Sequence, residues 1–205
     1  MGSSTVRRRA AGATPVLIIT GTSGAGKGTL ERALLERIPE LELAVSATTR
    51  ERRPGEQHGR EYWFLSEDEF DRKIEGGEFL EWVQLDWGPR SGTLLTEIDR
   101  IRGEGRVPLL DLETEGALRV RERMPGAVTV FVRAPSFEEN ERRLKERATE
   151  NESEIEKRLR AARAQLAQAD EFDHVIVNDD LDRAVGELED IVRGKLATAG
   201  SMSAP

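Results

Sequence analysis

The sequence predicts an α/β fold in which a parallel sheet is flanked by helices, and three observations support this. Short apolar runs alternate with longer segments in which apolar residues recur at a helical period. A glycine-rich segment, GTSGAGKGT, stands between the first apolar run and the first helical segment. The chain has 205 residues, which is enough for one domain with a sizeable core.

The expected strands of this sheet are short, β-rich and apolar enough to be covered on both faces. They span residues 16–20, 107–112, 128–132 and 174–177. The expected helices span residues 27–38, 114–124, 137–147, 154–169 and 181–196. Three helix starts carry a serine followed three positions later by a glutamate, the pattern of a capping box, at Ser66, Ser136 and Ser153.

Residues 46–95 interrupt this alternation. Two short strands, at 61–65 and 79–84, flank one helix and follow an arginine-rich loop. We therefore expect a small strand-rich insertion in a core made of residues 15–45 and 96–195. The polar ends, residues 1–14 and 196–205, are expected to be disordered. The arginine-rich, acid-free leader also weakly resembles an organellar transit peptide, which is the alternative.

Composition argues against several classes of protein. Acidic residues number 39 and basic residues 31, so the net charge is −8 and general nucleic-acid binding is not expected. No apolar stretch approaches the roughly 20 residues of a membrane helix, and no membrane partner is expected. The chain has no cysteine, which excludes disulfides and thiolate metal sites and is compatible with the cytoplasmic location that we expect.

The glycine-rich segment has the composition of a phosphate-binding loop. Its glycines let backbone N–H groups turn around an anion at the start of a helix, and Lys27 adds positive charge for the β- and γ-phosphates. Gly28 stands where this pattern usually has Ser or Thr. The expected ATP-binding residues of the loop are Gly21, Thr22, Ser23, Gly24, Ala25, Gly26, Lys27, Gly28 and Thr29.

The Lys-Gly-Thr ending resembles loops of the adenylate-kinase type. This resemblance implies that Thr29 contacts the α-phosphate and that no loop hydroxyl binds the metal. Mg²⁺ would then be held by phosphates, by water and by an acidic group after the strand at 107–112, where Asp111 and Glu113 are the candidates. We assign no side chain as a direct metal ligand. The alternative is that one of these acids only caps the helix beginning near Thr114.

The segment SATTRERRPGEQHGREYWF, residues 46–64, concentrates positive charge in an otherwise acidic chain. Four arginines fall within it at positions 50, 52, 53 and 60. Guanidinium groups suit a phosphate dianion better than ammonium groups do. The alternative is a solvated, arginine-rich loop without a ligand.

The pattern S-x-TTR-x-x-RPGE-x-x-G-x-x-Y-x-F, followed by EFLEW and later by IVNDDLD, resembles the guanylate kinase family over about residues 15–195. The resemblance implies a P-loop NTPase-type core, a GMP-binding insertion and a helical lid at about 137–165. It also implies phosphorylation of GMP to GDP in purine nucleotide metabolism. ATP would be the phosphoryl donor, Mg²⁺ the cofactor, and GMP and ATP the small-molecule substrates.

The resemblance further implies roles for individual arginines. Arg50 and Arg53 would bind the acceptor phosphate together with Tyr62. In the lid, Arg147 and Arg158 would reach the transferring phosphoryl group, whose transition state spreads charge over its oxygens. The implied catalytic set is Lys27, Arg53, Arg147 and Arg158.

The implied guanine-reading set is Glu81 with Ser46 and Thr93. A carboxylate can accept from both the ring N–H and the amino group of guanine, while a hydroxyl donates to the carbonyl; adenine would leave the carboxylate unpaired. The alternative for Glu81 is an ordinary surface carboxylate. The remaining implied residues are Asp111 and Glu113 on the GMP side, and Asn178 and Asp179 near adenine, where a turn and helix cap is the alternative.

Two further positions besides Gly28 depart from the family pattern. The family's GNYYGT hairpin is Gly-Pro-Arg-Ser-Gly-Thr at residues 88–93. Ser91 thus replaces a tyrosine that donates to the GMP phosphate, and Arg90 is the candidate substitute donor. The family's two aspartates are here Asp111 and Glu113.

Two other functions are compatible with parts of this pattern. The first is a scaffold module with a guanylate-kinase-like domain that binds phosphopeptides, which the intact glycines and Lys27 disfavour. The second is a related P-loop kinase acting on another phosphate ester, such as a ribose bisphosphate. Such an enzyme would have no use for Glu81 together with Ser46 and Thr93.

Overall fold

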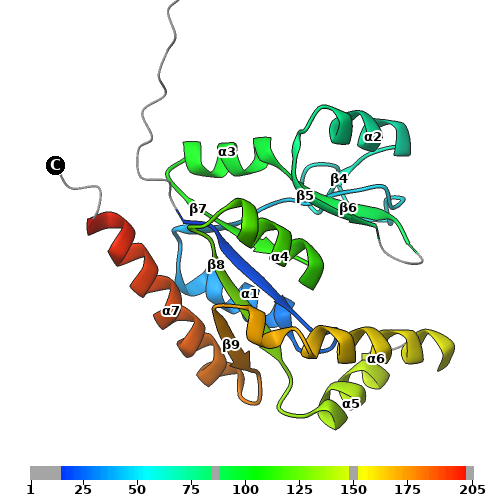
Figure 1. Cartoon of the computed structure of the whole chain (residues 1–205), viewed down its shortest axis with the longest axis vertical. Helices are drawn as coiled ribbons and strands as arrows, with labels where there is room; N and C mark the ends of the chain where they lie inside the picture. Colours follow the sequence, from blue (N-terminus) through cyan, green and yellow to red (C-terminus); the bar gives the residue numbers. More distant parts are fainter. Residues whose placement is uncertain (1–14, 85–87, 148–151, 202–205) are drawn as a thin grey trace, which may run out of the picture.

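The core of the protein is a five-stranded parallel sheet in the order β2-β7-β1-β8-β9. The computed structural model describes residues 15–84, 88–147 and 152–201 (Figure 1). The strands are β1 (Leu17–Gly21), β2 (Leu41–Leu43), β7 (Val107–Asp111), β8 (Val128–Arg133) and β9 (His174–Val177). The predicted fold class is confirmed. The edge strand β2 was not predicted, because three residues carry too little pattern to be recognised.

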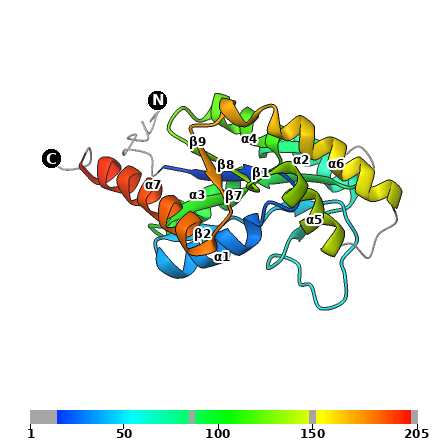
Figure 2. The same cartoon turned by 90° about the horizontal axis from the view of Figure 1, so that it is seen from below.

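Helices cover both faces of this sheet (Figure 2). One face packs against α1 (Lys27–Arg37) and α7 (Leu181–Ser201), and the other against α3 (Leu95–Gly103) and α4 (Thr114–Arg123). The central strand β1 is apolar along its length because its side chains pack against helices on both faces. Leu17 and Ile19 join the cluster under α1 and α7, while Ile18 joins the cluster under α3 and α4.

The insertion forms a second sheet in the order β4-β3-β6-β5. Its elements are β3 (Ala47–Thr48), β4 (Trp63–Phe64), α2 (Glu67–Glu75), β5 (Phe79–Gln84) and β6 (Arg90–Leu94). A small core of its own includes Ala47, Phe70, Phe79 and Leu94. The strand-rich insertion is therefore as expected. β6 and α3 were missed, because β6 carries a glycine in place of a strand-forming side chain and α3 follows it without a turn signal.

The expected lid is helical throughout its described part. It consists of α5 (Phe137–Arg147) and α6 (Glu152–Leu166), and the short helix η1 (Ala169–Glu171) leads from it back to β9. Figure 1 shows the insertion at the upper right and α5 and α6 at the lower right, so that both lie on the same side of the core. The insertion and the lid are therefore two separate structural units.

The three predicted capping boxes have different outcomes. Ser66 and Glu69 form the complete reciprocal pair at the start of α2. Ser136 accepts a bond from the backbone N–H of Glu139 at 3.1 Å, but the Glu139 carboxylate bonds two arginines of α5 instead. Ser153 lies within α6, so the prediction that it caps this helix is wrong.

The predicted disordered tail, residues 196–205, starts too early in the chain. α7 continues to Ser201, so residues 196–201 are helical rather than part of the tail. The segment Lys-Leu-Ala-Thr-Ala contains strong helix formers, which explains the extension. The leader, residues 1–14, and residues 202–205 lie outside the described part. None of the helices within the described residues is both long enough and apolar enough to cross a membrane.

Candidate functional site

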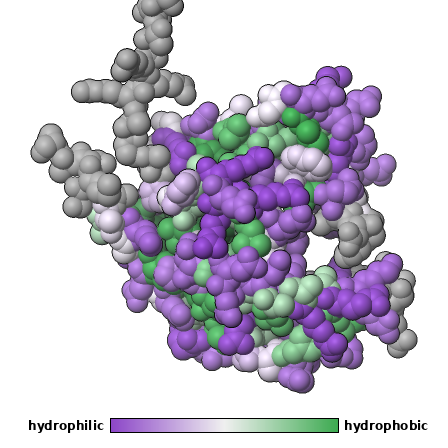
Figure 3. All heavy atoms as spheres, in the orientation of Figure 1, coloured by the Kyte–Doolittle hydropathy of each residue, from purple (hydrophilic) through white to green (hydrophobic). Residues whose placement is uncertain are grey.

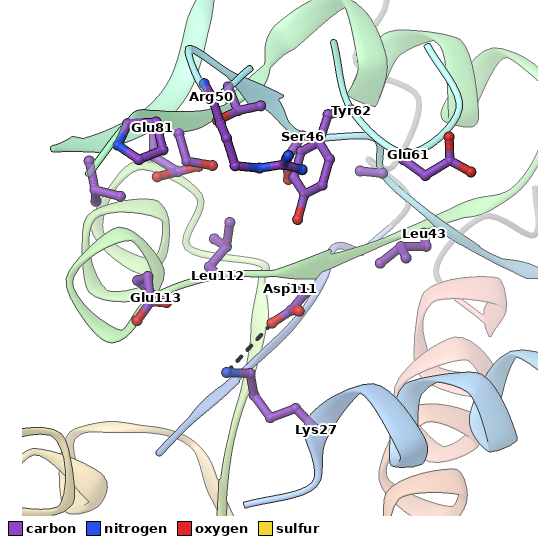
Figure 4. Close-up of a pocket in the computed structure, with 15 residues that line it drawn as sticks. Lys27, Leu43, Ser46, Arg50, Glu61, Tyr62, Glu81, Asp111, Leu112 and Glu113 are labelled. Atoms are coloured by element: carbon purple, nitrogen blue, oxygen red, sulfur yellow. Dashed lines mark hydrogen bonds and ion pairs between the residues drawn. The ribbon is translucent and has the colours of Figure 1, made fainter. Parts of the chain in front are cut away.

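A cavity of about 320 Å³ opens between the insertion and the carboxyl edge of the core sheet. Ligands of open α/β sheets bind at this edge, where the loops after the parallel strands meet. Figure 4 shows side chains of the insertion on one side of the cavity, and those of α1 and the end of β7 on the other. Seven of the predicted residues line it: Lys27, Ser46, Arg50, Tyr62, Glu81, Asp111 and Glu113.

The phosphate-binding loop is held in place by buried hydrogen bonds. Asn178 follows β9 and donates from its side chain to the carbonyl oxygen of Ala25 at 2.7 Å. Thr22 donates from its hydroxyl to Asn140 of α5 at 2.9 Å. Gly26 has a φ of 90°, and a Cβ at this position would stand 2.4 Å from the Asn178 amide nitrogen. Only glycine fits here, because both the backbone conformation and the close contact exclude a side chain.

The two residues after β9 that were predicted to contact ATP, Asn178 and Asp179, lie in different environments. Asn178 is buried and its amide supports the loop, a role that the sequence did not reveal. Asp179 lines a separate hollow of about 340 Å³ together with Gly24, Gly26, Thr29 and others. The alternative of a turn and a cap also holds in part, because Asp180 accepts a bond from the backbone N–H of Arg183 at the start of α7.

Lys27 lies between the loop and the end of β7. Its ammonium group is 3.8 Å from Asp111 Oδ1 and donates to the carbonyl oxygen of Gly21 at 3.3 Å (Figure 4). Although 45% of the Asp111 side chain is exposed, the surrounding protein raises its pKa through burial, and Lys27 opposes this rise. Charge at this position is therefore sensitive to whatever binds in the cavity.

A buried acid, Glu31, stands one helical turn after Lys27. Its residue is 5% exposed, and its Oε1 has no hydrogen-bond partner within the described part of the chain. The pKa of Glu31 is raised to about 8, mainly by burial and also by the charge of Asp111, while Lys27 opposes the rise. The sequence analysis did not single out Glu31. The available signal was its place on the buried face of the helix, between two apolar positions.

Gly28 occupies an open position in the first turn of α1. It is exposed, and a Cβ added there would meet no atom within 4 Å. Its φ does not lie in the left-handed region. Unlike Gly26, it is not required by the backbone, so a serine fits at this position.

The predicted guanine-reading residues come together at the insertion end of the cavity. Glu81 on β5 is only 3% exposed, and its Oε1 accepts from the Thr93 hydroxyl on β6 at 3.0 Å. Burial raises the pKa of Glu81, and hydrogen bonds from Thr93 oppose the rise. Ser46 lines the same cavity, whereas Thr93 is buried behind Glu81 and bonds that carboxylate. An ordinary surface carboxylate is thus excluded for Glu81.

The acceptor loop contains an internal ion pair. Arg50 donates to Glu56 at 2.8 Å, and its guanidinium carbon lies 5.3 Å from the centre of the Tyr62 ring. The other oxygen of Glu56 accepts from the backbone N–H of Arg53. Arg53 itself is exposed and does not line the cavity, so the structure brings only Arg50 and Tyr62 of the three predicted phosphate-binding residues to its wall.

Arg90 belongs to the packing of the insertion. Its guanidinium bonds Glu67 and Asp71 of α2 and lies 4.7 Å from the centre of the Phe70 ring. The side chain is 11% exposed and is not part of the cavity lining. It is therefore not positioned as the substitute for the family's tyrosine, whose place is taken by Ser91 at the cavity wall.

The lid contributes a second cavity, of about 550 Å³, beside the first. Arg158 and Gln165 of α6 line it together with Ser23 and Glu113, and Gln165 donates to Glu113 at 3.1 Å. In Figure 3 the surface is notched between the insertion and the lid, and hydrophilic residues cover most of its rim. Arg147 is the last residue of α5, and its side chain lies outside the described part of the chain.

The family resemblance implies a glycine-rich loop that faces the residues assigned to guanine. Comparison with known proteins tests whether the chain belongs to that family. A family model described as guanylate kinase matches residues 13–195. The chain belongs to the guanylate kinase family. The guanylate kinase of Rubrobacter xylanophilus is 47% identical over 178 residues, which are 87% of this chain and 93% of that protein.

Two further guanylate kinases extend the comparison. That of Synechococcus elongatus is 47% identical over 174 residues, covering 85% of this chain and 94% of the relative. The crystal structure of guanylate kinase from Anaplasma phagocytophilum superposes with a TM-score of 0.71 at 28% identity, covering 90% of this chain and 87% of that one. The likeness thus includes the core, the insertion and the lid.

Proposed function

We propose that this guanylate kinase family member transfers the γ-phosphoryl group of ATP to the phosphate of GMP, giving ADP and GDP for purine nucleotide metabolism. One observation carries the proposal. A single cavity is lined by Lys27 beside the phosphate-binding loop and by the buried carboxylate of Glu81 on the opposite wall. A donor phosphate and a guanine base can therefore be held within one reaction space.

The donor end stabilises negative charge. Backbone N–H groups of the loop at the start of α1 surround the ATP phosphates, and Lys27 neutralises part of their charge. Thr29 contacts the α-phosphate, and Asp179 lies near adenine. Arg158, at the neighbouring cavity, and Arg147 approach from the lid and stabilise the charge that spreads over the transferring oxygens.

The acceptor end positions GMP. Glu81 accepts from the ring N–H and the amino group of guanine, and Ser46 donates to its carbonyl. Thr93 supports Glu81 through their mutual hydrogen bond. Arg50 binds the acceptor phosphate beside Tyr62, and Arg53 turns inward from its exposed loop when GMP is bound. Holding the acceptor in line with the donor contributes several kcal/mol to catalysis.

Magnesium fits the carboxylates that reach the cavity near Lys27. Asp111 and Glu113 both line it and provide oxygen atoms, which Mg²⁺ prefers. These two side chains would hold a hydrated ion against the ATP phosphates through its water molecules. The bound ion neutralises phosphate charge, and Lys27 does the same from the side of α1.

The bulk properties support a cytoplasmic enzyme without macromolecular ligands. The chain has no cysteine, and its net charge of −8 disfavours contact with anionic nucleic acid or membrane surfaces. The proposed substrates are small molecules. Their phosphates are met by local positive charge at Lys27 and in the acceptor loop.

A panel of phosphate acceptors tests the proposal. With ATP and Mg²⁺, ADP formation should be fastest with GMP, slower with dGMP, and close to background with AMP, CMP, UMP and a ribose bisphosphate. The Glu81→Gln variant should lose selectivity for GMP more than affinity for ATP, because an amide cannot accept both guanine donors. Equal rates with AMP would overturn the guanine assignment. Phosphopeptide binding without turnover of any acceptor would instead support the scaffold module.

A further inference from the structure

Glu81 is held from two sides, and only one of them is a hydrogen bond. Its Oε1 accepts from Thr93, which lies on the neighbouring strand β6. Its Oε2 faces helix α4 at Gly116. A Cβ built on Gly116 would stand 2.7 Å from this oxygen and 3.3 Å from the carboxyl carbon. Real Cβ atoms do not approach an oxygen this closely, so the missing side chain provides the space that the carboxylate occupies.

The part of the helix that follows Gly116 is anchored to β5 on both sides of Glu81. Arg119 donates to the carbonyl oxygen of Trp82 at 2.5 Å, and Arg123 donates to the carbonyl oxygen of Leu80 at 2.7 Å. These carbonyls belong to the two neighbours of Glu81 in the chain. Because α4 belongs to the core and β5 to the insertion, the two bonds join the two units at the residue that reads the base. The helix cannot withdraw from Glu81 without breaking them.

Glycine in this position has a cost. Gly116 is the third residue of α4, and glycine is a poorer helix former than alanine. It is buried, and its φ is not in the left-handed region, so the backbone conformation does not require glycine. Gly116 differs from glycines such as Gly186 of α7 in the close approach of the Glu81 carboxylate. A Cβ added at Gly186 would meet nothing within 4 Å.

We propose that Gly116 is a specificity-determining positioning residue, which sets the place of the Glu81 carboxylate and thereby the preference for guanine over bases without its amino group. The proposal rests on the proposed function, in which Glu81 reads guanine. A methyl group at Gly116 displaces the carboxylate by several tenths of an ångström. A carboxylate that accepts from two donors of one base loses both alignments when it moves, since hydrogen bonds weaken steeply with poor geometry.

The test compares GMP with IMP, whose base keeps the ring N–H but lacks the amino group. Gly116→Ala should lower the ratio of kcat/KM for GMP to that for IMP by about tenfold. It should raise the KM for GMP more than it lowers kcat, and leave the KM for ATP and the melting temperature close to the unsubstituted values. The matched control, Gly186→Ala, should change neither ratio nor KM. Parallel losses for GMP and IMP, together with a lower Tm, would show a merely structural role and overturn the proposal.

A second variant keeps the test decisive if Gly116→Ala folds poorly. Glu81→Asp shortens the side chain by one methylene and frees space beside residue 116. The double variant Gly116→Ala with Glu81→Asp should therefore lose less GMP selectivity than the product of the two single losses. Strict multiplicativity of the losses would refute the contact. Glu81→Gln distinguishes failure of the proposed function from failure of the Gly116 proposal. If Glu81→Gln leaves the GMP:IMP ratio of kcat/KM unchanged, the guanine assignment fails. If Glu81→Gln changes this ratio and Gly116→Ala does not, only the role of Gly116 is refuted.

Discussion

The two ends of the cavity are held together by different interactions. The phosphate-binding loop depends on backbone geometry and on buried, uncharged hydrogen bonds, of which Asn178 to Ala25 is an example. The acceptor loop depends on charged side chains near the surface, such as the pair of Arg50 with Glu56. Buried bonds of the first kind are costly to break, whereas ion pairs that water still reaches contribute less; the Arg50 and Glu56 side chains are 22% and 18% exposed.

This difference indicates how the two substrates are bound. The donor end is formed before ATP arrives, because its loop is fixed by Asn178 after β9 and by Asn140 of α5. At the acceptor end Glu56 pairs with the Arg50 side chain, whereas Arg53 contacts Glu56 through its backbone N–H and has an exposed side chain. A GMP phosphate would compete with Glu56 for Arg50 and draw Arg53 inward. Substitutions at the acceptor end should thus alter catalysis with little effect on folding, and those at the donor loop should alter both.

The largest effect is expected at Arg53. Arg53→Ala should lower kcat with GMP by about a hundredfold or more, since the acceptor phosphate would no longer be held in line with the donor. The melting temperature should be unchanged, because the side chain is exposed. Turnover and thermal unfolding are both measured. Arg52→Ala, the exposed neighbour, is the matched control, and an Arg53→Ala variant that keeps more than half of the activity would contradict the assigned role.

The next effect concerns pH and the acid beneath the donor end. The pKa of Glu31 is about 8 in the folded protein, against an ordinary value of 4.5, so the unfolded chain loses this proton first as pH rises. Folding stability should therefore fall between about pH 4.5 and pH 8 and change little from this group above that range. Glu31→Gln mimics the protonated acid without titrating. The free energy of unfolding of this variant should exceed that of the unsubstituted protein by a difference that grows to roughly 2 kcal/mol or more at pH 8.

Denaturant unfolding at pH 5 and pH 8 measures this advantage. Glu36→Gln, an exposed residue of the same helix, is the control and should show no such growth. Asp111, whose pKa is also raised, contributes its own slope in both the unsubstituted protein and the Gln variant. A constant difference between Glu31→Gln and the unsubstituted protein at the two pH values would exclude a buried, protonated Glu31.

A smaller effect is expected for the bond that supports the loop. Asn178→Ala removes the donor to the buried carbonyl of Ala25 and should cost about 1–3 kcal/mol of unfolding free energy, with a raised KM for ATP. Glu56→Gln, at the acceptor loop, should leave stability close to that of the unsubstituted protein and change the KM for GMP. If Glu56→Gln destabilised the fold as much as Asn178→Ala, the two ends would not differ as described.

The smallest effect is expected at Gly28. Gly28→Ser fits without strain and places a hydroxyl next to Lys27, where many phosphate loops have one. It should lower the Mg²⁺ concentration needed for half-maximal rate by a few fold, because one metal-bound water can be replaced. Gly28→Ala controls for the added Cβ. Thr29→Ala should weaken ATP binding with little change in Mg²⁺ dependence; a loss of metal dependence in that variant would make Thr29 the metal ligand instead.

The sequence by itself determined the α/β class, the phosphate loop and the family. The unbroken apolar run before Gly21 predicts a central strand, because both faces of that strand must be covered. The loop was recognisable because its chemistry resides in the backbone, and glycines at set spacing are a local requirement. Glu81 was predicted through its motif, and its burial agrees with the role assigned to it.

Only the tertiary structure decided which distant residues support these groups. Asn178 bonds a carbonyl 153 positions earlier, and Thr93 bonds Glu81 across two strands, one of which was not predicted. Gly116 faces the Glu81 carboxylate although it belongs to a helix of the core. No local pattern encodes such contacts, because they arise where separate elements pack. For the same reason the sequence offered Arg90 as a candidate donor to the acceptor phosphate, whereas packing against α2 directs its guanidinium to Glu67 and Asp71.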